Sequence, residues 1–127
     1  MPGKVYRTAI YCRLSREDGD KVESNSIASQ RAICEDYIAR HDDLEIVCEP
    51  FVDDGYSGVS FNRPNFKKLE DAIRKGAIDC IVVKDLSRFS RNYIDGGRYL
   101  EKIFPQLGIR FIAVNDAYDS LTGDPQS

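Results

Sequence analysis

The sequence VYRTAIYCRLS, residues 5–15, opens with β-branched and aromatic side chains and closes on Arg13, Leu14 and Ser15. Its apolar part is typical of a buried strand, which we expect over residues 5–12. Arg13 and Ser15 follow where the chain leaves that strand. The segment therefore predicts the first strand of a sheet, with two polar side chains just beyond its carboxyl end.

Outward from this segment, strand patterns and helix patterns alternate along the chain. A polar loop over residues 15–24 leads into the first helix, which Ser24 or Asn25 can cap. Pro64 is expected to open the second helix and Gly76 to end it. The expected elements are helices over residues 26–40, 64–75 and 92–104, and further strands over residues 44–52, 78–83 and 109–114. The expected buried residues of the last two helices are Phe66, Leu69, Ile73, Tyr93, Leu100, Ile103 and Phe104.

This alternation implies a mainly parallel sheet between layers of helices. We expect an α/β domain with a four- to five-stranded sheet and helices on both faces. It should span residues 1–115, whereas the polar residues 116–127 are expected to form a tail or the start of a truncated linker.

Length and composition narrow the function. A chain of 127 residues fits one domain, and its net charge of −3 argues against a general nucleic-acid binder. No apolar run is long enough to span a membrane, and the N-terminus lacks the pattern of a signal peptide. The four cysteines contain no CxxC spacing and are interpreted as buried thiols. We therefore expect a cytoplasmic protein.

Serine and arginine residues recur where the predicted strands end. Arg13 and Ser15 follow the first strand, and the later arginines are Arg63, Arg88 and Arg91. In a parallel sheet the carboxyl ends of the strands meet at one edge, so these side chains are expected to converge. Guanidinium groups repel one another unless an anion holds them together, and their planar fork matches the oxygens of a phosphate.

Phosphoryl transfer at Ser15 is the chemistry that this pattern indicates. A serine hydroxyl is a weak nucleophile, and the single histidine, His41, lies at the far end of a helix. Nearby arginines can stabilise the alkoxide and the phosphate oxygens instead. The sequence contains no obvious set of carboxylates for magnesium, so we expect a reaction without metal or other cofactor. Taken singly, each of these residues is more simply explained as a cap, a turn or a solvated surface residue.

Four motifs in this order resemble the serine recombinases, also called resolvases and invertases. The residues that carry the resemblance are Tyr11, Arg13 and Ser15; Ser26, Ile27 and Gln30; Asp54, Ser57, Gly58, Arg63 and Pro64; and Arg88 and Arg91. The family has an aspartate before the first arginine of the last motif, where this chain has Ser87. Asp85 is expected to point elsewhere if that segment is helical. The polar loop and the last motif are most like the large serine recombinases of conjugative transposons and phages.

The resemblance implies a resolvase-like catalytic domain that acts in DNA integration or excision. Ser15 would attack a DNA phosphodiester and form a 5′-phosphoserine intermediate, after which strands are exchanged and rejoined without a cofactor. The implied catalytic residues are Ser15, Arg13, Arg63, Arg88, Arg91 and Gln30, with Tyr11, Asp54, Ser57 and Ser87 in support. The implied partners are double-stranded DNA recombination sites and further copies of the chain, as dimers and tetramers. A long helix and DNA-binding domains are expected in the full-length enzyme.

Three other interpretations remain open at this point. Asp53, Asp54 and Lys84 are similar to the acidic pocket and lysine of a receiver-like regulatory domain, although a receiver has its acidic pair after the first strand. The loss of the family aspartate at Ser87 fits a catalytically inactive recombinase-like domain. Ser15 could also serve a phosphatase or a small-molecule phosphotransferase.

Overall fold

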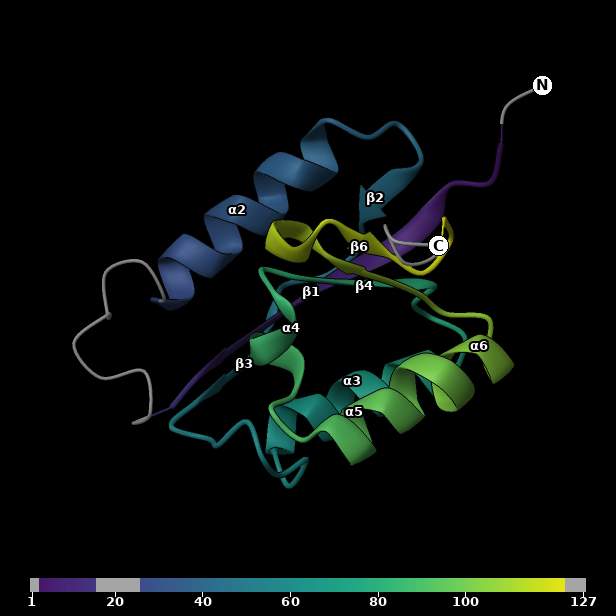
Figure 1. Cartoon of the computed structure of the whole chain (residues 1–127). Coiled ribbons are helices and arrows are strands. Elements are labelled where there is room, and N and C mark those ends of the chain that lie inside the picture. The colour runs from purple at the N-terminus through teal and green to yellow at the C-terminus, as the bar shows by residue number, and fades with distance from the viewer. Residues whose placement is uncertain (1–2, 16–25, 123–127) are drawn as a thin grey trace.

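The protein is described by a computed structural model over residues 3–15 and 26–122 (Figure 1). Residues 16–24 of the expected loop and the expected caps Ser24 and Asn25 lie outside the described residues. The strands are β1 (Tyr6–Leu14), β2 (Leu44–Ile46), β3 (Phe51–Asp54), β4 (Cys80–Val83), β5 (Arg110–Ala113) and β6 (Tyr118–Asp119). The helices are α2 (Ile27–Ala39), α3 (Pro64–Arg74), α4 (Leu86–Phe89), α5 (Tyr93–Arg98) and α6 (Phe104–Gln106), with a π-helix over Tyr99–Ile103 and a 3-10 helix over Val114–Asp116.

The strands form one six-stranded sheet in the order β2-β1-β4-β5-β6, with β3 also paired to β1. All pairings are parallel except that of β5 with β6. The α/β fold with a mainly parallel sheet is therefore confirmed. The sheet has more strands than the four to five expected, because one predicted strand is divided and β6 was not foreseen.

The divided strand is the one expected over residues 44–52. Its two parts, β2 and β3, pair with the same side of β1, in the registers Tyr6↔Leu44 and Tyr11↔Phe51. More residues separate Leu44 from Phe51 than separate their partners on β1, so the chain bulges away between the two parts. Pro50 lies in this bulge, where its missing N–H costs no ladder hydrogen bond.

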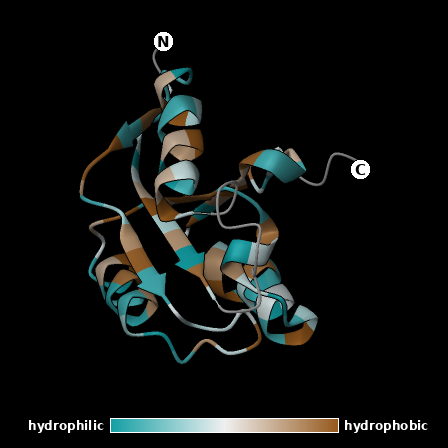
Figure 2. Cartoon of the chain, turned by 90° about the vertical axis from the view of Figure 1, so that its left-hand side faces the viewer, coloured by the Kyte–Doolittle hydropathy of each residue, from teal (hydrophilic) through white to brown (hydrophobic). Residues whose placement is uncertain are grey.

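Helices lie on both faces of the sheet, with α2 on one face and α3, α5 and α6 on the other (Figure 1). Two apolar clusters pack between the strands and these helices. Alternate residues of β1 point to opposite faces, so that Ile10 and Cys12 pack toward α2 while Ala9 and Tyr11 pack toward α3 and α6. Figure 2 shows apolar residues along the strands between the helices. The cluster on the α3 side holds the buried residues Phe66, Leu69, Ile73, Ile81, Val83, Phe89, Phe104 and Phe111. Arg13 shares the parity of Tyr11 and therefore emerges on the α3 side of the sheet.

The ends of the first two helices have local causes. Ser26 caps α2, because its side chain accepts a hydrogen bond from the Ser29 N–H at 3.1 Å. Pro64 opens α3 as predicted. Gly76 follows its last turn with φ +78°, a conformation that favours glycine. The predicted inner face of α3 is confirmed, because Phe66, Leu69 and Ile73 are all buried.

The third helical region differs from its prediction. Tyr93 was expected to pack inward but is 97% exposed, because it is the first residue of α5 and the buried face begins one turn later at Gly96. The helix expected to end at residue 104 continues, because Pro105 lies within α6. A proline there cannot donate to the turn before it, and the preceding residues adopt the wider π-helix.

Residues 116–122 do not form the polar tail that the sequence suggested. Tyr118 pairs with Ala113 of β5, which makes β6 the edge strand. Asp119 accepts two hydrogen bonds from Arg110, at 3.0 Å from Nε and 2.6 Å from Nη2. Arg110 also donates to Asp43 at 2.7 Å. The polar side chain of Asp119 thus serves to hold the segment through its ion pair with Arg110. Composition alone does not distinguish a polar segment held by ion pairs from a polar linker.

Candidate active site

The candidate site lies where β1, β3 and β4 end. Ser15 is the first residue after β1, and its side chain is almost fully buried. Gly55 and Tyr56 donate their backbone N–H groups to the Leu14 carbonyl, which brings the loop after β3 beside Ser15. The segment after β4 forms the short helix α4. The three loops expected at this edge of the sheet therefore meet.

Arg13 connects these loops. Its guanidinium is fully buried and donates to three backbone carbonyl oxygens: from Nη1 to Tyr56 at 2.8 Å, from Nε to Arg88 at 3.1 Å and from Nη2 to Ser87 at 2.5 Å. One acceptor lies in the loop after β3 and two lie in α4. The planar fork of Arg13 thus fixes both loops relative to the end of β1.

Gln30 and Arg88 hold the backbone of Arg13. The Gln30 amide accepts from the Arg13 N–H at 3.1 Å and donates to the Arg13 carbonyl at 2.9 Å. The same carbonyl accepts from Nη1 of Arg88 at 2.9 Å. Gln30 is fully buried. Its contacts are those of a residue that positions Arg13.

Arg63 joins the site through Tyr11. Arg63 is fully buried, and it donates from Nη1 to the Tyr11 hydroxyl and from Nη2 to the Gly58 carbonyl, both at 3.4 Å. The Tyr11 hydroxyl in turn donates to Asp53 at 2.8 Å. Burial raises the pKa of Tyr11 well above its ordinary value, even though Arg63 opposes the shift. The phenol therefore stays a neutral bridge between Arg63 and Asp53.

Asp53, and not Asp54, supplies the buried carboxylate. Besides the Tyr11 hydroxyl, it accepts from the backbone N–H groups of Asn65 at 3.0 Å and Phe66 at 2.9 Å, in the first turn of α3. Asp54 was expected in a supporting role but has an exposed side chain. The alternation of β3 explains this difference, because Asp53 shares a face with the half-buried Phe51. The sequence prediction ended this strand at Val52 and so lost that signal.

Gly58 marks the closest approach between the loop after β3 and the arginines. A Cβ at this position would meet Nη2 of Arg13 and Cγ of Arg91, each at 2.8 Å. The Gly58 carbonyl accepts the backbone N–H of Arg91 at 2.7 Å. Arg91 is the one predicted arginine with an exposed side chain. The Arg63 side chain and the Arg91 main chain therefore contact Gly58, and the Arg88 side chain contacts the Arg13 peptide.

The two serines of the supporting set have different surroundings. Ser57 is half-buried, and its hydroxyl accepts from the Val59 N–H at 3.1 Å, which is a local turn. Ser87 donates to Asp85 Oδ1 at 2.5 Å and accepts from Nε and Nη2 of Arg88, each at 3.3 Å. Asp85 was expected to point elsewhere; this was wrong. As the N-cap of α4, it turns its carboxylate back over the first turn, toward Ser87 and Arg88.

The geometry of Asp53 does not match a receiver-like pocket. Its carboxylate is almost fully buried and is bound by Tyr11 and the start of α3. Lys84, the lysine of that interpretation, contacts Asp85 at 3.9 Å. Asp53 and Lys84 are thus engaged in separate contacts.

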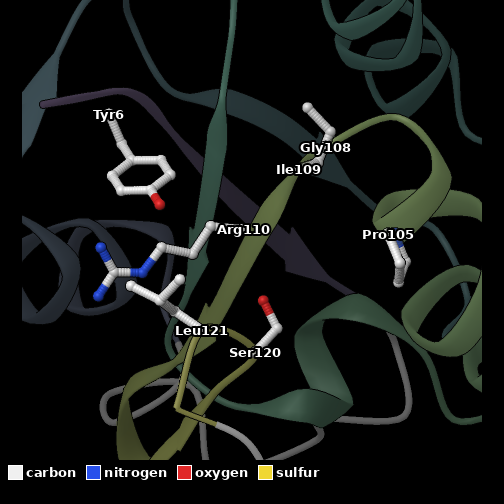
Figure 3. A pocket seen from close by; sticks show the side chains of 7 residues that line it. All are labelled: Tyr6, Pro105, Gly108, Ile109, Arg110, Ser120 and Leu121. Atoms are coloured by element: carbon white, nitrogen blue, oxygen red, sulfur yellow. The ribbon is translucent and has the colours of Figure 1, made fainter. Parts of the chain in front are cut away.

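A hollow lies at the opposite edge of the sheet (Figure 3). It is lined by the first residues of β1 and β5, Tyr6 and Arg110, together with Leu121 beyond β6. The guanidinium of Arg110 is held by Asp43 and Asp119, which raise its pKa. In doubly wound sheets ligands bind at the carboxyl ends of the strands, so this hollow is not the candidate site.

The fold and this edge of the sheet define the class of the protein: a resolvase-like α/β domain with a serine and arginines at the carboxyl ends of its parallel strands. Residues 8–126 match the family described as Resolvase, N terminal domain, and the chain belongs to this family. Its similarity to solved serine recombinase domains confirms the resemblance seen in the sequence.

Three relatives illustrate the similarity. The structure of the N-terminal catalytic domain of TP901-1 integrase is 27% identical, with a TM-score of 0.78 over 91% of this chain and 82% of that chain. A resolvase family site-specific recombinase from Streptococcus pneumoniae is 29% identical, with a TM-score of 0.73 over 97% of this chain and 80% of that one. A putative DNA recombinase of Bacillus subtilis (strain 168) is 31% identical over 68% of this chain. The match spans only 16% of that Bacillus protein.

Among residues 3–15 and 26–122, no helix has the length and apolar character needed to cross a membrane.

Proposed function

We propose that this chain is the catalytic domain of a site-specific DNA recombinase in which Ser15 attacks a DNA phosphodiester. The observation that carries the proposal is that the buried arginines Arg13, Arg63 and Arg88 lie around Gly58 and the Arg13 peptide, at the end of the strand that leads to Ser15. The main chain of Arg91 joins them at Gly58. Several guanidinium groups at one edge suit the dispersed charge of a transferring phosphoryl group.

The proposed step exchanges one phosphate ester for another. The Ser15 oxygen bonds to phosphorus and releases its proton to solvent, while the bond from phosphorus to the 3′ oxygen breaks. The 3′ oxygen takes up a proton from a donor in the site, which solvent then reprotonates. We assign this proton to Arg88. The products are a 5′-phosphoserine and a free 3′ hydroxyl. Because the ester retains the energy of the broken bond, the strands can be rejoined by the reverse reaction without ATP.

For DNA to bind, the Arg13 guanidinium must exchange some of its hydrogen-bond acceptors for phosphate oxygens. In this structure the Arg13 guanidinium donates to carbonyl oxygens of Tyr56, Ser87 and Arg88. Phosphate oxygens would have to replace some of these acceptors, because the guanidinium is fully buried among them. The loop after β3 and helix α4 would therefore shift when DNA binds.

The proposed partners are double-stranded recombination sites and further copies of the chain, paired as dimers that join into a tetramer. Arginines take the place of a metal ion in this mechanism. With a net charge of −3, the isolated chain is expected to bind DNA weakly. Tight, sequence-specific binding of the chain alone in a gel-shift assay would contradict this part of the proposal.

The experiment is to trap the covalent intermediate. The complete gene product is incubated with a nicked duplex that carries its recombination site, and adducts are separated on denaturing gels. Wild-type protein should form a covalent adduct, with the phosphate mapped to Ser15 by peptide mass spectrometry, and Ser15→Ala should form none. Ser120→Ala, at the opposite edge of the sheet, is the matched control and should react like wild type. Adduct formation that survives Ser15→Ala would refute the proposal.

A further inference from the structure

We propose that Asp85 is a positioning residue for Arg88 and that it acts through the hydroxyl of Ser87. This inference rests on the proposed function, because it concerns the orientation of an arginine that binds the phosphate. It assigns a role to a carboxylate that the sequence motifs leave out. It also accounts for the serine that stands where the family has an aspartate.

The three residues form a short chain of polar contacts. Ser87 Oγ lies 2.5 Å from Asp85 Oδ1, and both Nε and Nη2 of Arg88 lie 3.3 Å from Ser87 Oγ. Nε of Arg88 is also 3.8 Å from Asp85 Oδ1, within ion-pair range. Arg88 is 1% exposed, so these contacts lie in a poorly solvated site where electrostatic interactions are strong.

The direction of each hydrogen bond follows from the chemistry of the groups. A carboxylate only accepts and a guanidinium only donates, whereas a hydroxyl has one proton and two lone pairs. Ser87 must therefore give its proton to Asp85 and turn both lone pairs toward Arg88. Its hydrogen-bonding capacity is then fully used. The negative charge of Asp85 polarises the hydroxyl and strengthens its acceptance from Arg88.

The opposite side of the Arg88 guanidinium is fixed as well. Nη1 donates to the Arg13 carbonyl at 2.9 Å, in the strand that leads to Ser15. Asp85 is itself held in place as the N-cap of α4, where Oδ1 accepts the Arg88 N–H at 3.2 Å. The carboxylate, the hydroxyl and the Arg13 peptide therefore set the plane of this guanidinium. An aspartate at position 87 could make the same contact directly.

The test begins with Asp85→Asn in the complete gene product. Asparagine caps a helix about as well as aspartate, so the fold and the thermal unfolding midpoint should be retained. The negative charge that polarises Ser87 is lost. We expect the rate of adduct formation on the nicked duplex to fall on the order of 100-fold, the loss that a misplacement of about 1 Å can cause. Asp95→Asn, which removes an exposed carboxylate from the first turn of α5, should leave the rate unchanged.

A double variant separates this role from a structural one. Asp85→Asn combined with Ser87→Asp moves the carboxylate next to Arg88, and the rate should return to within a few-fold of wild type. A purely structural role for Asp85 predicts no such rescue. The inference is overturned if Asp85→Asn reacts at the wild-type rate, or if the folded double variant stays as slow as the single one.

The same adduct assay distinguishes a failure of the proposed function from a failure of the proposed role of Asp85. If Ser15→Ala still forms the adduct, the proposed function fails, whatever Asp85 does. If Ser15→Ala abolishes the adduct while Asp85→Asn has no effect, the proposed function stands and only the role of Asp85 is refuted.

Discussion

The guanidinium of Arg88 donates from Nη1 to the backbone carbonyl of Arg13 at 2.9 Å, across a separation of 75 residues in the sequence. In return, the Arg13 side chain donates from Nε to the Arg88 carbonyl at 3.1 Å. Each arginine thus holds the main chain of the other. This reciprocal pair joins the end of β1 to α4, and it determines which substitutions should disturb the candidate site.

The two adjacent aspartates at the end of β3 should respond differently to neutralisation. Asp53→Asn places an amide N–H₂ against a set of donors, because Asp53 accepts from Tyr11, Asn65 and Phe66. Hydrogen bonds to a buried charged group contribute about 1.5–3 kcal/mol each, so urea unfolding should show a loss of roughly that size. Asp54→Asn, at an exposed position, is the matched control and should stay within about 0.5 kcal/mol of wild type. Equal losses in the two variants would contradict the assignment.

Gln30 should matter for both stability and reaction. Gln30→Ala removes both amide contacts to the Arg13 peptide and leaves its buried N–H without this acceptor. The expected loss in the free energy of unfolding is about 1–3 kcal/mol, accompanied by slower adduct formation. Gln106→Ala, at an exposed position in α6, is the control. A Gln30→Ala protein with unchanged stability would show that the bidentate contact is dispensable.

Gly58→Ala tests the close approach of the loop to the arginines. The new Cβ would lie 2.8 Å from Nη2 of Arg13, which donates to the Ser87 carbonyl, and the rest of the guanidinium is held by the carbonyl oxygens of Tyr56 and Arg88. Overpacking of this kind costs about 1–3 kcal/mol, and the displaced guanidinium should also slow adduct formation. Gly97→Ala is the matched control, because the nearest atom to its Cβ, Oε2 of Glu101, is 3.9 Å away. That helical change should stabilise the protein by up to about 1 kcal/mol.

Alkaline pH should destabilise the fold through its buried thiols. Burial raises the pKa of Cys80 to about 12, against an ordinary value near 9. Between these values the unfolded chain releases a proton that the folded chain retains. The stabilising contribution is therefore complete below pH 9 and is lost as the pH rises toward 12.

The measurement is the free energy of unfolding in urea between pH 9 and pH 11. In Cys80→Ala its decline with pH should be shallower than in wild type by up to about 1.4 kcal/mol per pH unit. Cys48→Ala removes a half-buried thiol and should change the slope less. A Cys80→Ala protein that keeps the wild-type slope would disprove the assignment.

Local sequence signals predicted the scaffold well for strands that are buried on both faces and for helix ends that a residue such as proline marks. The apolar run that contains β4, Cys80–Val83, is buried throughout, and Pro64 opens α3 where predicted. Predictions failed where the outcome depended on a distant partner. Tyr93 has the helical spacing of an inward residue but lies before the packed turn, and Asp119 belongs to a strand only because Arg110 holds it.

The sequence by itself determined the order of the elements, the parallel sheet and the edge at which Ser15 and the arginines gather, because periodicity and chain direction are local properties. Tertiary structure alone decided which polar groups touch: Asp53 rather than Asp54 against Tyr11, Gln30 on the Arg13 peptide, and Asp85 behind Ser87. Those choices depend on strand registers and side-chain directions set by packing between segments far apart in the chain. A hydrogen bond forms or fails within a few tenths of an ångström, a precision that no local pattern encodes.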